Sequence, residues 1–204
     1  MCYATAYEQI EEALEAQDRA ALLRQTLDQQ GLITGRTIGA VGGKSAWTTS
    51  GFGREVMEFY ENLRPSGLFG GILDNPASAT QKVVKWTRAN ATTFGHQFEY
   101  LRDAVKDLKR LRAFSTDAER QLALSIPDAR AIGVSYRVCE NCPRFFRVFA
   151  KIEKRTLVFA DPDWVYVFLR DGSSIKVSRF DRLGRPRSAQ EILERFADLE
   201  KSYP

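Results

Sequence analysis

Residues 164–180 of this chain read WVYVFLRDGSSIKVSRF. Aromatic and β-branched residues recur in both halves of the stretch, and the dipeptide Asp171-Gly172 separates the halves. Such residues favour strands, and Asp-Gly between two strands is typical of a two-residue hairpin turn. The stretch therefore predicts a pair of antiparallel strands.

Further strand-like segments follow Pro127, at residues 132–138, 144–153 and 156–160. Turn-forming residues separate them, so we expect a four- or five-stranded antiparallel meander in this part of the chain. A helix over residues 188–201 should close it. Ser188 and, three residues later, Glu191 form the capping box that starts such a helix.

In the first 127 residues the apolar side chains recur with a different period. Apolar residues recur at helical spacing over 4–30, 53–63, 75–114 and 117–125, with a glycine-rich loop over 31–53. The predicted fold class is α+β: a mainly helical N-terminal region (residues 1–127) packed against the meander and the C-terminal helix (residues 128–204). The two regions can form one integrated domain.

Charge is distributed unevenly along the chain. Residues 1–80 carry six Lys/Arg and ten Asp/Glu, and residues 81–204 carry 24 and 16, which gives the net charge of +4. Many charges over 99–110 face an opposite charge three residues away and neutralise each other. The unexplained positive charge therefore concentrates in 144–187 and indicates an anionic partner.

The candidate binding residues are lysines and arginines of this basic part: Lys151, Lys154, Arg155, Lys176, Arg179, Arg182, Arg185 and Arg187. Basic groups beside exposed aromatic rings suit phosphate contacts and base stacking in single-stranded nucleic acid. Arginine equally suits an acidic protein surface. No motif of an established nucleic-acid-binding fold accompanies these residues. The expected partner is thus nucleic acid or a ribonucleoprotein, or else an acidic protein.

The other distinctive motif is Cys139-Glu-Asn-Cys142-Pro143. These cysteines are candidate metal ligands, but a structural zinc site needs four, and only Cys2 and His96 remain as partners. The motif also resembles the active-site turn of thioredoxin-like proteins, whose first thiolate lies at a helix N-terminus. The resemblance covers only about residues 132–200 and lacks the usual Ile/Val-Pro before the next strand. A strand-connecting turn is the third interpretation.

Two further motifs carry no predicted chemistry. In the segment from Gly39 to Lys44-Ser45 the first glycine is one residue too close for a phosphate loop, which favours a connector. His96 has no recognisable nucleophile or carboxylate partner and is predicted to be a surface or interface residue rather than a catalytic one. We expect no catalytic residue and no cofactor.

The leading prediction is therefore a non-enzymatic, nucleic-acid-associated protein that uses its basic C-terminal surface. The alternative is a protein–protein adaptor or inhibitor with separate acidic and basic surfaces, and the third possibility is a thiol oxidoreductase. No run of apolar residues is long enough to form a membrane-spanning helix, and the N-terminus lacks signal-peptide character. We expect no membrane association and a cytoplasmic location.

Overall fold

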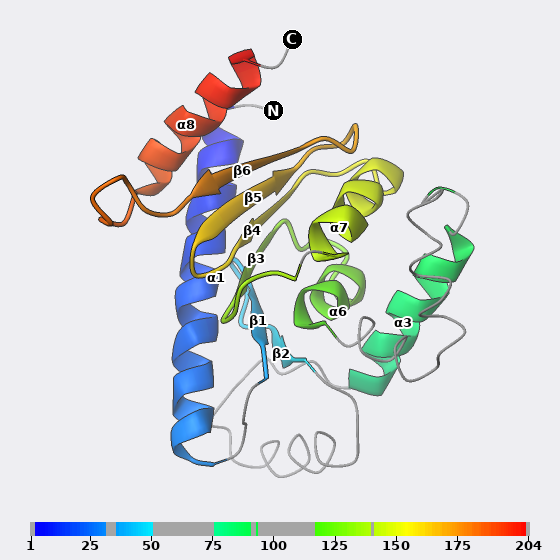
Figure 1. Cartoon of the computed structure of the whole chain (residues 1–204). Helices are drawn as coiled ribbons and strands as arrows, with labels where there is room; N and C mark the ends of the chain where they lie inside the picture. Colours follow the sequence, from blue (N-terminus) through cyan, green and yellow to red (C-terminus); the bar gives the residue numbers. More distant parts are fainter. Residues whose placement is uncertain are drawn as a thin grey trace.

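A computed structural model describes residues 3–31, 36–50, 76–90, 93, 117–139 and 141–202. Its helices are α1 (Tyr3–Gln29), α3 (Pro76–Ala89), α6 (Ala118–Ser125), α7 (Asn141–Ile152) and α8 (Ala189–Ser202). Its strands are β1 (Ile38–Val41), β2 (Trp47–Thr49), β3 (Ala131–Val134), β4 (Leu157–Ala160), β5 (Trp164–Phe168) and β6 (Ser174–Ser178). Figure 1 shows their arrangement.

The six strands form one mixed sheet in the order β2-β1-β3-β4-β5-β6. β3 and β4 run parallel, and every other neighbouring pair is antiparallel. The α+β class is confirmed, but the sheet is not a pure meander. Because β1 pairs with β3, the sheet joins the N-terminal and C-terminal parts of the chain.

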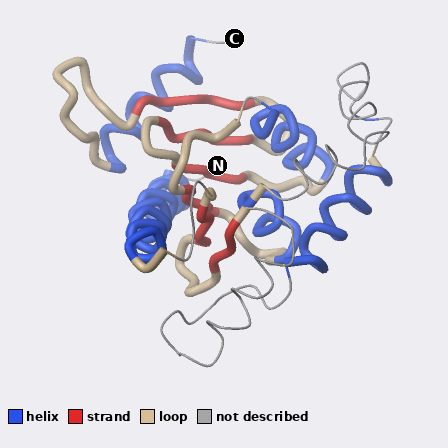
Figure 2. Tube along the Cα trace, turned by 60° about the horizontal axis from the view of Figure 1, so that its bottom comes forward, coloured by secondary structure: helices blue, strands red, loops and turns tan. Residues whose placement is uncertain are grey.

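Helices cover both faces of the sheet (Figures 1 and 2). On one face α1 and α8 pack against the apolar side chains of the strands, among them Val158, Val165 and Val177. On the other face α6 and α7 enclose an aromatic core that includes Phe146, Phe159 and Phe168. α3 packs outside these two helices, where the Trp86 ring contacts Phe145 and Phe149.

The predicted helices at 4–30, 117–125 and 188–201 are confirmed as α1, α6 and α8. The capping box is formed as well, since the backbone N–H of Ser188 donates to Glu191 Oε2 (2.8 Å) and that of Glu191 to Ser188 Oγ (3.3 Å). The Asp171-Gly172 turn joins β5 to β6, with Gly172 at φ 91°. The first part of the predicted helix over 75–114 is confirmed as α3. Most of its remainder, from residue 91 on, lies outside the described residues, as does the predicted helix over 53–63.

Two further predictions differ from the structure. Residues 144–152 of the predicted strand 144–153 belong to α7, and their buried positions 145, 146, 149 and 150 follow helical spacing. The glycine-rich segment, predicted as a loop, contains the hairpin β1–β2. The helix α7 also explains the parallel pair, because a crossover is needed to bring β4 beside β3 in the same direction.

Candidate metal centre

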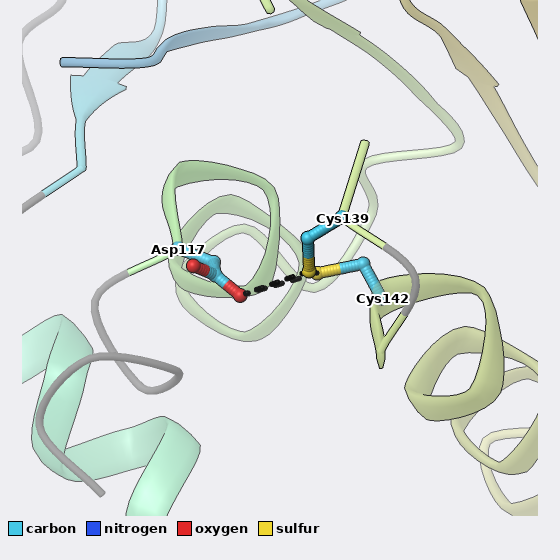
Figure 3. A group of neighbouring side chains, drawn as sticks. All are labelled: Asp117, Cys139 and Cys142. Atoms are coloured by element: carbon cyan, nitrogen blue, oxygen red, sulfur yellow. Dashed lines mark hydrogen bonds between the residues drawn. The ribbon is translucent and has the colours of Figure 1, made fainter. Parts of the chain in front are cut away.

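The N-termini of α6 and α7 meet beside the C-terminal end of β3. α6 precedes β3 in the chain and α7 follows it, and both helices lie on the same face of the sheet. Figure 3 shows that Asp117, at the start of α6, and Cys139 and Cys142, at the start of α7, point toward one another. Ligands commonly bind outside the carboxyl ends of strands in sheets with parallel pairs.

The three side chains form a compact set of donor atoms. The Sγ atoms of Cys139 and Cys142 lie 3.1 Å apart, and Asp117 Oδ2 lies 3.2 Å from Cys142 Sγ and 3.8 Å from Cys139 Sγ. Ligand atoms around a tetrahedral zinc ion lie about 3.6–3.8 Å apart, given bonds of about 2.3 Å to sulfur and 2.0–2.2 Å to oxygen. Shifts of a few tenths of an ångström would therefore seat a zinc ion.

Asp117 occupies the N-cap position of α6 but does not cap the helix. Its backbone is extended (φ −61°, ψ 127°), as at ordinary N-caps, yet its side chain makes no capping hydrogen bond. An N-cap aspartate normally accepts a hydrogen bond from the second or third N–H of the helix, which stabilises it by about 1 kcal/mol. Here the carboxylate is turned to the cysteines instead, which indicates that its position serves the cluster.

The first turn of α6 also buries a second acid, Glu119, which is 4% exposed. Burial, and then the nearby charge of Asp117, raise the pKa of the Glu119 carboxyl to about 7. The thiol of Cys142 is within hydrogen-bonding reach of this carboxyl and opposes the rise. Burial likewise raises the pKa of Asp117. Aspartate and glutamate side chains are almost never fully buried unless they are paired, so a second buried carboxyl here is unusual.

Arg120 supplies a buried positive charge to the cluster. Its Nε and Nη2 atoms each lie 3.3 Å from Cys142 Sγ, and its Nε lies 3.3 Å from Asp117 Oδ2. The side chain is 2% exposed, and its guanidinium packs 4.8 Å from the Phe145 ring centroid. Burial disfavours the charge, but the thiol of Cys142 and the carboxylate of Asp117 outweigh it and raise the pKa of Arg120.

The two cysteines differ in their surroundings. Cys139 is exposed, and the hydrogen bond with Cys142 lowers the pKa of its thiol, whereas burial raises the pKa of Cys142 well above the ordinary value. Both are free thiols at the N-terminus of α7, where the helix dipole favours negative charge. As metal ligands, the two thiolates and the Asp117 carboxylate would carry three negative charges. Arg120 balances one of them and a divalent cation would balance the other two.

Asp161, after β4, holds the segment that leads into Cys139. This carboxylate is fully buried. Its Oδ2 accepts hydrogen bonds from the backbone N–H of Val138 (3.1 Å) and from the Tyr166 hydroxyl (3.2 Å), and its Oδ1 from the N–H groups of Asp163 (2.9 Å) and Trp164 (2.8 Å). The position of Cys139 thus depends on the β4–β5 turn.

Three predicted binding residues lie at the end of α7 far from the metal centre. Lys151 and Lys154 are exposed. The Arg155 guanidinium instead donates to backbone carbonyls, to Ala123 (2.7 Å), Ala129 (3.4 Å) and Pro127, and burial lowers its pKa. Arg155 therefore ties α6 to the start of β4.

The other five predicted residues lie on β6 and the loop after it. Lys176 is placed over the rings of Trp164 and Tyr166. Arg179 donates to Gln17 and pairs with Asp18 on α1. The loop residues have these environments: Arg182 is exposed, Arg185 pairs with Asp181, and Arg187 donates to the carbonyls of Ser178 and Phe180. The structure thus separates the predicted basic set into two groups joined by β6.

Sequence reasoning identified Cys139 and Cys142 as metal candidates but missed Asp117, Glu119 and Arg120. The signal that could have found them is the pair of acids two residues apart, Asp117-Ala-Glu119, at a helix start upstream of the C-x-x-C motif. Cys2 and His96, the further ligands that the sequence suggested, lie outside the described residues. Among those described, Asp117, Cys139 and Cys142 are the one group of three or more potential metal ligands.

Comparison of the chain with protein-family models and with curated proteins finds no match. In the described part of the chain, no helix has the length and apolar character needed to span a membrane.

Proposed function

We propose that this protein is a zinc-dependent hydrolytic deaminase that acts on the amino group of a nucleobase. The observation that carries the proposal is the convergence of Asp117, Cys139 and Cys142, with donor atoms within 4.8 Å of one another, next to the buried carboxyl of Glu119. In zinc deaminases, three ligands follow the pattern H-x-E…P-C-x-x-C, and the glutamate two residues after the first ligand transfers protons without binding the ion. The likeness is one of site arrangement.

The number of ligands supports a catalytic rather than a structural ion. Structural zinc sites have four protein ligands, whereas catalytic sites have three and leave a position for water. A zinc ion held by these three side chains would supply an activated water at neutral pH. Thiolate ligands also favour zinc over magnesium or calcium, which prefer oxygen.

Glu119 is placed to move protons at the site. It would accept a proton from the attacking water and deliver protons to the base and to the departing amino group. Overall the amino group and water become a carbonyl and ammonia, with no oxidant or reductant required. Because Glu119 is buried beside the ligands, it can serve only a substrate that enters the centre.

The chain departs from the common deaminase motif at two positions. Asp117 stands where these enzymes have histidine or cysteine, and Val138 stands where proline usually precedes the first cysteine of C-x-x-C. An aspartate adds a negative charge that a histidine would not. The buried guanidinium of Arg120, 3.3 Å from both Asp117 and Cys142, compensates that charge.

The test is ammonia release by the zinc-loaded protein from cytosine, adenine and guanine compounds, both as free nucleosides and within single-stranded oligonucleotides. We expect at least one of these to be deaminated by the wild-type chain. Glu119→Gln should retain zinc and lose at least about 10²-fold in rate, because proton transfer contributes about 10²–10⁴-fold. Zinc-loaded protein that is inactive on all of them, or an active Glu119→Gln variant, would contradict the proposal.

A thiol oxidoreductase is the second candidate, because the two sulfur atoms lie 3.1 Å apart with one thiol exposed and the other buried. In such an oxidoreductase, neither Asp117 nor Glu119 would take part in the reaction. Reduction of an insulin disulfide by the metal-free protein, abolished in Cys139→Ser, would favour it. The absence of such reduction would leave the metal-dependent function. A cytoplasmic location suits both candidates, since both need reduced thiols.

A further inference from the structure

A basic strip runs from the metal centre along α7 and β6, and we infer that it binds the phosphates of a single-stranded nucleic acid whose base enters the centre. The strip consists of Arg144, Arg147 and Lys176. That a base enters the metal centre rests on the proposed function. The binding itself depends only on the strip.

The α7 side of the strip begins beside the metal centre. Arg144 is two residues after Cys142, in the first turn of α7, and Arg147 follows three residues later. Residues at this spacing lie on the same side of a helix, and both side chains are exposed. The opposite side of α7 carries Cys142, Phe145 and Phe149, which are buried. The helix therefore presents two guanidinium groups outward next to the ligands.

The β6 side lies directly across from α7. Arg147 Nε donates to Ser174 Oγ (2.8 Å), the first residue of β6, which places the helix beside this strand. Alternation along β6 puts Lys176 on the same face as Ser174. The Lys176 ammonium lies 3.9 Å from the ring centroid of Trp164, at the end of β5 nearest the metal centre. The three basic groups therefore share one face of the molecule.

The β6 side of the strip also lies close to the metal centre. The backbone N–H of Trp164 donates to Asp161 (2.8 Å), and Asp161 also accepts from Val138, the residue before Cys139. A strand of nucleic acid held by Lys176 and the two arginines would thus pass the ligands. Trp164 is partly exposed, so the ring that carries the Lys176 ammonium lies at the surface.

No acidic group of the described residues forms an ion pair with the strip. Arg179 and Arg185, on the loop after β6, do form ion pairs. Unpaired, exposed cations next to a catalytic centre attract a polyanion. We infer a single strand rather than a duplex, because a base must leave the stack before its amino group can reach a buried site.

The experiment measures binding of a short fluorescein-labelled single-stranded DNA and of the matching RNA by fluorescence anisotropy over a range of salt concentrations. The zinc-loaded Glu119→Gln chain is used so that the probe is not consumed. The test variant adds R144Q and R147Q. The matched control adds R182Q and R185Q, which remove the same charge from the loop after β6, the contact region predicted from the sequence.

The wild-type strip should give a plot of log affinity against log salt with a slope of about −2 or steeper, at about −0.7 for each phosphate contact. R144Q/R147Q should make that slope shallower by about 1.4 and weaken binding about tenfold or more. R182Q/R185Q should change the affinity by less than about twofold. No binding at low salt, or a loss confined to the control variant, would overturn the strip.

Two readouts separate this inference from the proposed function. In the chain with Glu119 intact, R144Q/R147Q should retain its zinc, and the control R182Q/R185Q should retain both its zinc and its ammonia release from free nucleosides. If the wild type releases no ammonia but R144Q/R147Q still weakens binding as expected, the proposed deaminase function is wrong and nucleic-acid binding by the strip is supported. If deamination proceeds and binding is insensitive to R144Q/R147Q, binding by the strip is wrong and the deaminase function is supported.

Discussion

Replacing Gly133 by alanine should destabilise the fold severely, because β3 and α1 touch through their backbones at this point. A Cβ atom on residue 133 would lie 1.9 Å from the backbone nitrogen of Gln17 and 2.3 Å from the carbonyl carbon of Ala16. Carbon atoms in contact lie about 3.5–4.0 Å apart. α1 would therefore have to move away from the sheet by about 1.5 Å or more.

The cost can be worked out from what such a movement disturbs. Overpacking alone typically costs about 1–3 kcal/mol, and here both partners are backbone, so no side chain can rotate to relieve the clash. Moving α1 would also loosen the packing of Ala13 and Ala20, which are fully buried against the sheet. We expect a loss of about 4 kcal/mol or more, a large part of the 5–15 kcal/mol that stabilises a typical domain.

The assay is urea unfolding of the full chain, with Gly184→Ala as the control. The Gly184→Ala substitution also costs stability, because the φ of this residue is 76°, but a Cβ there would meet nothing within 4 Å. That control should lose only about 1 kcal/mol. A Gly133→Ala variant as stable as the control would refute the close packing of α1 on β3.

Three further predictions concern residues that support the site and the fold. Asp161→Asn should weaken zinc affinity about 10–100-fold, measured by competition with a chromophoric chelator, because one of its carboxylate oxygens orients the segment before the cysteine ligands; unchanged affinity would contradict that role. Arg155→Met should cost about 2 kcal/mol in urea unfolding, since the carbonyls of Ala123 and Ala129 lose their side-chain donor; a loss below about 0.5 kcal/mol would argue against the tie. Ser188→Ala should lower Tm by about 2–4 °C through loss of the α8 cap, and an unchanged Tm would show that the cap adds little.

The sequence predicts those parts of the fold whose signals are local. Asp171-Gly172 between two strand-like runs identifies the β5–β6 hairpin, and the capping box identifies the start of α8. The segment 144–153 was misassigned because phenylalanine and valine favour strands by composition. Its buried positions nevertheless have helical spacing, so the period was the better guide.

The metal centre could not be predicted in full because its third ligand has an ordinary local explanation. An aspartate just before a helix is expected to cap it, so Asp117 by itself gives no signal of a metal ligand in the sequence. Only the three-dimensional arrangement shows that its carboxylate makes no capping hydrogen bond and lies 3.2 Å from Cys142, 25 positions along the chain. The charge pattern likewise indicated an anionic partner without showing which basic groups are already engaged within the protein.

The zinc content of the full chain tests the central claim most directly. The protein would be stripped with a chelator, reloaded with excess zinc, freed of unbound metal and analysed by atomic emission. We predict one zinc ion per wild-type chain, little or none in Asp117→Ala or Cys142→Ser, and full occupancy in Glu119→Gln, which is not a ligand. A wild-type chain without zinc, or undiminished zinc in both ligand variants, would contradict the metal centre and the function derived from it.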